Sequence, residues 1–289
     1  MADVNKYHAH ITSKHKLFNL NLKEVWRYKD LIMLFTKRSF TLTYKQTVLG
    51  PAWIFLNPLI SSLIHAFVFG SVAGFSEDLG PNVPTLLFYL VSNAAWTFFS
   101  TCITANASTF TANAGVFGKV YFPRLTTPIS NVLSSVIRFA VQMLLVAGFM
   151  VYFLFTNSGY SPNWAMLPMV LVELIHLGLL GMGFGIIISS MTTKYRDLSV
   201  LVTFGVQLWM YITPIVYPIS TLGEGKYRTF MMLNPVTAPT EIIRNAFLGT
   251  DLASDVWLFL AISWALTVVV VVFGVMIFNK VEKTFMDTV

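Results

Sequence analysis

The sequence predicts an all-α integral membrane protein with six transmembrane helices, an N-terminal interfacial amphipathic helix and an extracytoplasmic re-entrant helical hairpin between spans 5 and 6. Two observations predict this class. Of the 289 residues, 55% are hydrophobic and only 11% are charged, whereas a soluble domain carries about 25% charged residues. The apolar residues also fall in long runs, and a run of about 20 is enough to cross a bilayer.

The transmembrane domain is predicted to cover residues 47–289, and a polar cytoplasmic tail is predicted at 1–21. The tail lacks the apolar segment and cleavage site of a signal peptide, so we expect none. A single cysteine, Cys102, predicts no disulfide framework. The six spans are expected at about 50–75, 83–107, 126–155, 164–191, 198–217 and 256–278.

Basic residues orient these spans, because Lys and Arg accumulate on cytoplasmic loops. Nine lie in the first 49 residues, and six more lie in the loops after spans 2 and 4 and in the C-terminal tail. Only Lys226, Arg228 and Arg244 lie on the opposite side. Both termini are therefore predicted to be cytoplasmic. Because the charges cluster in this way, the net charge of +6 indicates membrane topology rather than nucleic-acid binding.

Residues 22–46 are too charged to span and are predicted to form an amphipathic helix in the membrane surface. On a helical wheel, the apolar arc holds Leu22, Val25, Trp26, Ile32, Met33 and Phe40, and the charged arc holds Lys23, Arg27, Asp30, Lys37 and Arg38. Leu31 and Leu34 depart from this pattern and are expected to face protein. The alternative is a soluble amphipathic helix packed on a partner.

The connection at 218–255 is long and contains apolar pieces that are too short to span. Apolar runs of about 10–14 residues are typical of re-entrant or interfacial segments. We expect a helical hairpin at 219–250 that dips back from the outer face. Its second helix is expected to start at Thr240, after Pro239, and to stop at Gly249. The alternative is an ordinary extracytoplasmic loop.

The sequence gives little support to an enzyme. "GVFGKV" at 115–120 is not a phosphate-binding loop, because Asn113 stands where the first glycine is needed and Val120 where Ser or Thr is needed. His65 and His176 are isolated in spans 1 and 4, so polar packing is expected of them. No Ser-His-Asp or paired-carboxylate pattern stands out, and we predict no catalytic residue and no metal site.

Arg138 and Glu173 are the clearest charges within the spans, where charges are costly and usually face protein or water. At about 1.5 Å per residue, Arg138 lies roughly 18 Å in from the cytoplasmic end of span 3, and Glu173 roughly 14 Å in from the outer end of span 4. These depths nearly coincide in an apolar core of about 30 Å. We therefore predict an intramembrane ion pair, with a role in transport as the alternative.

Three stretches together resemble one family. "YKQTVLGPAWIFLNPLI" at 44–60 is similar to the start of the first span in ABC-2 type permeases of polysaccharide-exporting ABC transporters. "KYRDL" at 194–198, followed by "WMYITPIVYP" at 209–218, resembles their fourth-to-fifth span region. "LNPVTAPTEIIRNAFLG" at 233–249 resembles their returning half-helices. The likeness covers the chain from about residue 22 to 279.

The resemblance implies a multi-pass permease subunit of the bacterial inner membrane that acts as a homodimer with two copies of a separate ATPase. The expected substrate is a lipid-linked polysaccharide: O antigen first, or teichoic acid or capsule. The permease would hold no cofactor, because ATP and Mg are bound by the partner ATPase. Membrane lipids are expected neighbours, and nucleic acid is not. The competing functions are a membrane-embedded enzyme acting on lipid-linked sugars and a channel or secondary transporter.

The resemblance also implies how the ATPase is coupled. The link between spans 4 and 5 would fit a cleft of the ATPase through Lys194, Tyr195, Arg196 and Asp197. Lys37 and Arg38 would lie on the docking surface that the interfacial helix provides. The alternative is that Lys194 and Arg196 simply mark a cytoplasmic loop. That alternative explains neither Tyr195 nor Asp197.

Two further sets of residues take roles from the resemblance. "GVFGKVYFPR" at 115–124 resembles a cytoplasmic gate helix, which would meet the pyrophosphate of a lipid-linked substrate through Phe117, Lys119, Tyr121 and Arg124. Here too, cytoplasmic topology alone is the alternative for the basic residues. Spans 1 and 5 would line a channel with Trp53, Phe67, Trp209 and Tyr211.

Overall fold

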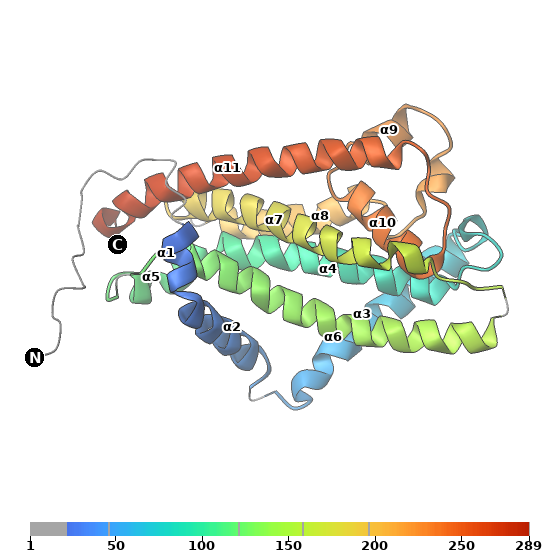
Figure 1. Cartoon of the computed structure of the whole chain (residues 1–289), viewed down its shortest axis with the longest axis horizontal. Helices are drawn as coiled ribbons and strands as arrows, with labels where there is room; N and C mark the ends of the chain where they lie inside the picture. Colours follow the sequence, from blue (N-terminus) through green and yellow to red (C-terminus); the bar gives the residue numbers. More distant parts are fainter. Residues whose placement is uncertain (1–21, 46, 121, 158, 196, 289) are drawn as a thin grey trace, which may run out of the picture.

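The computed structural model of the chain describes residues 22–45, 47–120, 122–157, 159–195 and 197–288, so the predicted tail at 1–21 lies outside it. Its long helices run side by side in a bundle, and the described residues include no strand (Figure 1). The helices are α1 (Leu22–Arg27), α2 (Lys29–Tyr44), η1 (Gly50–Ala52), α3 (Trp53–His65), η2 (Ala66–Val72), η3 (Glu77–Leu79), α4 (Thr85–Ala107), α5 (Thr109–Phe117), α6 (Thr126–Thr156), η4 (Trp164–Met166), α7 (Leu167–Thr192), α8 (Leu198–Ile212), η5 (Ile219–Leu222), α9 (Lys226–Met232), α10 (Thr237–Leu248) and α11 (Val256–Thr288). The predicted all-α class is confirmed.

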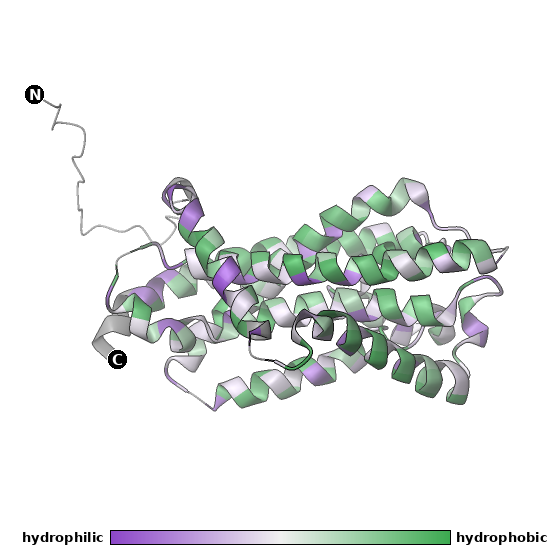
Figure 2. Cartoon of the chain, turned by 90° about the horizontal axis from the view of Figure 1, so that it is seen from below, coloured by the Kyte–Doolittle hydropathy of each residue, from purple (hydrophilic) through white to green (hydrophobic). Residues whose placement is uncertain are grey.

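Five helical segments are long and apolar enough to cross a membrane, and they match five of the six predicted spans. They are Gly50–Val72, Thr85–Ala107, Thr126–Thr156, Trp164–Thr192 and Val256–Glu282. Figure 2 shows hydrophobic residues along the length of these helices, while hydrophilic residues are most frequent toward the end of the bundle that holds the end of α11. The chain is therefore a multi-pass membrane protein.

The span predicted at 198–217 is shorter than expected. Its helix, α8, has 15 residues and ends at Ile212, which gives a length of about 22 Å against an apolar core of about 30 Å. Pro214 explains the early end, because proline disfavours the helical conformation at the residue before it. Thr213 is accordingly extended, with φ −91° and ψ 137°.

The α4 helix forms the centre of the bundle, between α7, α6, α3 and α10. Glycines in α7 allow its neighbours to come close, as small residues commonly do in membrane helices. A Cβ on Gly185 would lie 2.8 Å from the backbone oxygen of Ile103 on α4. A Cβ on Gly183 would lie 2.9 Å from the Val270 side chain on α11. Thus α7 packs tightly on both sides.

Contacts between helix termini define two ends of the bundle. At one end, the Thr192 hydroxyl at the close of α7 donates to the Ala107 carbonyl at the close of α4, at 3.2 Å, and Phe110 of α5 stacks on Phe278 of α11. We name this the α5 end. At the opposite end, Asn163 before α7 donates to the Asn245 side chain of α10 at 3.0 Å. We name this the α10 end.

The predicted interfacial helix consists of two helices, α1 and α2, that meet at Tyr28. Its apolar arc is divided. Val25 and Ile32 are buried against the α5 end, whereas Trp26 and Met33 are exposed. Leu34 is also exposed on this chain, so the expectation that it faces protein stays a prediction. The placement of this segment in the membrane surface stays a prediction.

The predicted hairpin region contains α9 and α10. Gly249 ends α10 in the left-handed conformation, with φ 65°, which confirms the predicted stop. The predicted start is wrong, because α10 begins at Thr237 rather than Thr240. The Asn234 side chain accepts a hydrogen bond from the Val236 amide at 3.2 Å and so forms a turn just before the helix. Pro239 is then tolerated within the first turn. Every residue of α10 is buried, and its re-entrant placement stays a prediction.

Candidate functional site

The link between α7 and α8 is tight and exposed. The Lys194 amide donates to the Met191 carbonyl at 3.1 Å, and the Leu198 amide donates to the Tyr195 carbonyl at 3.3 Å, so the backbone turns with little slack. Tyr195 is 54% exposed, and the Lys194 ammonium lies 5.3 Å from its ring centroid. Asp197 is also exposed, whereas Arg196 lies outside the described residues. The link therefore presents an aromatic ring and charges at the α5 end.

Lys37 and Arg38 are exposed on α2. The opposite side of this helix packs on α6, where the buried Thr36 hydroxyl donates to the Ser130 carbonyl at 3.4 Å. The two basic side chains consequently point away from the bundle. Among the described residues, no hydrogen bond or ion pair joins Lys37 or Arg38 to the link between α7 and α8, so their membership in one docking surface stays a prediction.

The segment predicted as a gate helix is only partly helical, because α5 ends at Phe117. Phe117 is buried and Lys119 is exposed, while Tyr121 lies outside the described residues. The Arg124 guanidinium is 5.5 Å from the Phe117 ring centroid, and its Nε lies 3.7 Å from a carboxylate oxygen of Glu282 on α11. Arg124 thus ties the segment after α5 to the end of α11. A cavity of about 290 Å³ lies beside these residues.

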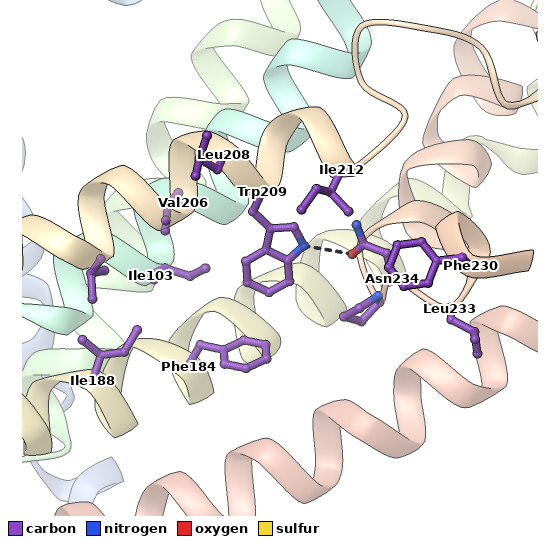
Figure 3. Close-up of a pocket in the computed structure, with 13 residues that line it drawn as sticks. Ile103, Phe184, Ile188, Val206, Leu208, Trp209, Ile212, Phe230, Leu233 and Asn234 are labelled. Atoms are coloured by element: carbon purple, nitrogen blue, oxygen red, sulfur yellow. Dashed lines mark hydrogen bonds between the residues drawn. The ribbon is translucent and has the colours of Figure 1, made fainter. Parts of the chain in front are cut away.

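A larger cavity of about 650 Å³ lies between α7, α8 and the α9–α10 region, and we name it the apolar cavity (Figure 3). Trp209 of α8 and Phe184 of α7 meet edge-to-face beside it, with ring centroids 5.4 Å apart. The Trp209 indole donates to the Asn234 side chain at 3.2 Å, and Asn234 donates in turn to the Thr213 hydroxyl at 2.8 Å. Because these polar groups bond one another, the cavity suits an apolar chain.

The four predicted channel residues do not line one cavity. Trp209 borders the apolar cavity, whereas Trp53 borders a different one between α3, α4 and α6. Phe67 and Tyr211 are exposed on the surface of the chain, at 67% and 55%. Their convergence on one channel stays a prediction.

The α8 helix is anchored at its α10 end, and most of its residues are not buried within this chain. Val206 is its one buried residue. Shortly after the end of α8, the Ile215 carbonyl accepts a hydrogen bond from Arg244 of α10, and the Val216 carbonyl accepts one from Tyr89 of α4, both at 3.2 Å. The tight link precedes α8 and this anchor follows it.

Arg244 was predicted on the outer side of the membrane but not as a buried residue. It is 1% exposed and donates to a Glu241 carboxylate oxygen at 2.6 Å and to the Ser92 hydroxyl at 2.7 Å. It also donates to the Pro214 carbonyl. Its guanidinium lies 4.2 Å from the Phe88 ring centroid. The signal in the sequence was the three-residue spacing of Glu241 and Arg244, which places both on one helix face.

In place of the ion pair predicted between Arg138 and Glu173, the structure shows a contact between Glu173 and His176. A Glu173 carboxylate oxygen lies 3.0 Å from Nδ1 of His176 on its own helix, and both side chains are fully buried. His176 Nε2 lies 3.0 Å from the Thr267 hydroxyl, and its ring stacks on Trp264. The histidine is therefore a polar packing residue, as expected, and joins α7 to α11. The Glu173–His176 spacing of three residues signalled this pair.

Possible metal ligands are not clustered in the part of the chain that the structure describes: no group of three or more His, Cys, Asp or Glu side chains could hold an ion there. The features that stand out are the exposed link, the helix that follows it and the apolar cavity.

Comparisons with known proteins agree with this arrangement. A family model described as ABC-2 type transporter matches residues 30–248. The O-antigen export system permease protein RfbA of Klebsiella pneumoniae is 27% identical over 259 residues, which cover 89% of this chain and 94% of that protein. A protein of the same name from Myxococcus xanthus is 28% identical over 221 residues, which cover 75% and 80% of the respective chains. Since the family match spans most of the sequence, this chain belongs to the ABC-2 type transporter family.

Proposed function

We propose that this chain is the permease subunit of an ATP-driven exporter that moves a lipid-linked polysaccharide, with O antigen as the first candidate, across the bacterial inner membrane. The subunit would act as a homodimer with two copies of a separate ATPase that binds ATP and Mg. Relatives named as O-antigen export permeases along nearly the whole chain support this substrate class.

One observation carries the coupling step: the exposed Tyr195 and its charged neighbours stand on a tight link directly before α8, which borders the apolar cavity. Closure of the ATPase would push this link. Because α8 is anchored beyond Ile212 and has few buried residues along its length, it would swing as a lever and change the width of the cavity. The apolar walls suit the lipid tail of the substrate, which avoids water.

Lys119 and Arg124 would meet the phosphates of the substrate at the α5 end. Lys119 is exposed and can contribute a mobile point charge. The Arg124 side chain is less free to move toward a substrate, because it also contacts Glu282. We therefore assign first contact to Lys119 and the positioning of the segment after α5 to Arg124.

The test is reconstitution in lipid vesicles with and without the ATPase partner. ATP hydrolysis and movement of lipid-linked polysaccharide should require both proteins. The double variant Tyr195→Ala/Asp197→Ala should lose stimulation of the ATPase. A matched control is Tyr227→Ala, since Tyr227 is 80% exposed on α9 and lies away from the link. Transport or ATP hydrolysis by this chain alone would overturn the proposal, and full stimulation in the double variant would remove the link from its role.

A further inference from the structure

A chain of hydrogen bonds runs from the buried pair of Glu173 and His176 to the wall of the apolar cavity. The Ser263 hydroxyl of α11 lies 3.1 Å from His176 Nε2 and donates to the Pro235 carbonyl at 2.6 Å. Pro235 lines the apolar cavity, in the turn between α9 and α10. Glu173, His176 and Ser263 are 0%, 0% and 2% exposed, so bulk water does not compete for these bonds.

The same turn is held by α8. The side chain of Asn234, next to Pro235, accepts a hydrogen bond from the Trp209 indole at 3.2 Å (Figure 3). It also donates to the Thr213 hydroxyl at 2.8 Å. The turn is therefore fixed by bonds from α8 at residue 234 and by a bond from α11 at residue 235.

The hydroxyl groups around His176 determine which ring nitrogen carries a proton. A hydroxyl has one hydrogen to donate, and a carbonyl can only accept. The Ser263 hydrogen is committed to the Pro235 carbonyl, and the Thr267 hydrogen is committed to the Ser263 carbonyl at 2.8 Å. Both hydroxyl oxygens, at 3.1 and 3.0 Å from Nε2, are thus acceptors there. His176 Nε2 consequently carries a proton and donates it.

Glu173 holds the opposite side of the ring. Its Oε2 lies 3.0 Å from Nδ1 of His176, and one proton lies between these atoms because two lone pairs at this distance would repel each other. Together with the proton on Nε2, this leaves the two side chains with no net charge, which suits a site inside a membrane span. The ring also stacks on Trp264, with centroids 4.2 Å apart, and this contact restricts its rotation.

We propose that His176 is a positioning residue for the apolar cavity: its Nε2 proton orients the Ser263 hydroxyl toward Pro235 and so holds the cavity wall in place. Glu173 acts through His176, by keeping the proton on Nε2. The position of this turn sets the room for an apolar chain, because residues 233–235 all line the cavity. The identity of that chain as the lipid tail of an exported substrate rests on the proposed function, whereas the positioning of the wall does not.

NMR of the full chain in lipid nanodiscs tests the proposal, with isotope-labelled nitrogen in the histidine rings and tryptophan indoles. The His176 signals are assigned by their loss in His176→Gln, and the Trp209 signal by its loss in Trp209→Phe. His176 should carry a proton on Nε2. A ring protonated on Nδ1 alone would overturn the proposal.

The Trp209 indole reports on the position of the wall, because it bonds the residue next to Pro235. Ser263→Ala should shift its resonance, since the Pro235 carbonyl loses its donor. Ser190→Ala is the matched control: Ser190 is also buried, but its hydroxyl donates to the Ile186 carbonyl within α7. A Trp209 resonance that is unchanged in Ser263→Ala, or shifted equally by Ser190→Ala, would overturn the proposal.

Replacements in the pair separate positioning from simple packing. His176→Leu should shift the Trp209 resonance as Ser263→Ala does. Glu173→Gln should leave it in place, because the glutamine amide can donate to Nδ1 and keep the proton of His176 on Nε2. An equal shift in Glu173→Gln and His176→Leu would mean that the pair only fills space, and it would overturn the proposal. If His176→Leu fails to fold, Ser263→Ala and Glu173→Gln still decide the outcome.

Transport in vesicles with the ATPase partner tests what the positioned wall does. Ser263→Ala should raise the concentration of lipid-linked polysaccharide that gives half-maximal transport by about two- to tenfold, as expected for one lost hydrogen bond. An unchanged concentration would overturn the role of the wall in binding the substrate. Because the NMR measurements use neither polysaccharide nor ATPase, their failure would leave the export proposal standing. A wild type that does not transport would refute the export proposal, and NMR would still decide the positioning.

Discussion

Charged side chains at the two ends of the bundle differ in burial and in pairing. At the α10 end, Arg244 is 1% exposed and bonds Glu241 at 2.6 Å. At the α5 end, Lys119, Lys194 and Asp197 are exposed. The first arrangement holds α10, α4 and the residues after α8 together, whereas the second leaves charges at the surface where a partner can reach them. The comparison teaches that Arg244 and Glu241 serve the fold, whereas Lys119, Lys194 and Asp197 are available for binding.

Replacing Arg244 with leucine should cause the largest loss of stability. Glu241 would keep a buried charge without its partner, and the Ile215 carbonyl would lose its donor. Breaking a buried pair on one side costs about 3–5 kcal/mol. Denaturant unfolding of the detergent-solubilised protein measures this loss. The matched change at the α5 end, Lys194→Leu, should alter the free energy of unfolding by less than about 0.5 kcal/mol.

The double variant Arg244→Leu/Glu241→Leu sharpens this prediction. It should be more stable than Arg244→Leu alone, because it removes both charges and leaves no lone carboxylate. If the single and double variants lose the same stability, the pair is not what fixes α10, and the contrast between the two ends is weakened.

A smaller effect is expected at the glycine that ends α10. Gly249 has φ 65°, and a Cβ there would collide with the Ser161 carbonyl oxygen. Gly249→Ala should therefore destabilise the protein by about 1–3 kcal/mol. Gly118, after α5, is the control: its φ is −79°, and the nearest atom to an added Cβ is 3.7 Å away. Gly118→Ala should be nearly neutral in the same unfolding measurement, and equal costs at the two glycines would contradict the prediction.

The ion pair of Arg228 and Asp255 at the α10 end should contribute less again, and its contribution should depend on pH. Two hydrogen bonds of 2.6 and 2.7 Å from Arg228 lower the pKa of Asp255 below its usual value. The pair therefore stabilises the fold above about pH 4, and this contribution is lost as the pH falls through the lowered pKa. Since both side chains are partly exposed, we expect about 0.5–1 kcal/mol at pH 7.

Unfolding of the wild type and of Asp255→Asn between pH 7 and pH 3 measures this contribution. The difference in free energy should be present at pH 7 and shrink at the acid end, because Asp255 takes up a proton in the unfolded chain at a higher pH than in the folded state. The pair of Arg124 and Glu282 at the α5 end is longer, at 3.7 Å. Glu282→Gln, measured in the same way, should therefore lower the free energy of unfolding by less than Asp255→Asn does. A difference that stays constant with pH would show that the carboxylate charge is not responsible.

The same contrast explains how far the sequence could predict this molecule. Long apolar runs predicted five span segments and the all-helical class, because membrane spans need length and apolarity and little else. The shorter α8 was less predictable, although Pro214 carried the signal. Residues of the link stood out in the sequence because their charges predicted a cytoplasmic loop and because a family resemblance implied a role for it.

Buried charges were harder to place, since their partners are set by packing between distant segments. Arg244 meets Ser92 of α4 and the Pro214 and Ile215 carbonyls, and none of these contacts follows from helical periodicity. The similar depths of Arg138 and Glu173 along their spans suggested that these two residues pair. The structure shows Glu173 beside His176 instead, because depth says nothing about which faces of two helices meet. Short-range spacing was the better guide, as the pairs at 173 and 176 and at 241 and 244 show.

The smallest effect on stability is expected at Tyr195, which is 54% exposed and contacts Lys194. Tyr195→Ala should change the free energy of unfolding by less than about 0.5 kcal/mol. If the link transmits the push of the ATPase, this variant should nevertheless lose much of the stimulation of ATP hydrolysis in vesicles. Arg244→Lys should show the reverse order, with a loss of stability because lysine cannot reproduce the fork of bonds to Glu241, Ser92 and Ile215. A Tyr195→Ala variant that is destabilised as much as Arg244→Lys would mean that the link also serves the fold, and the division between the two ends would fail.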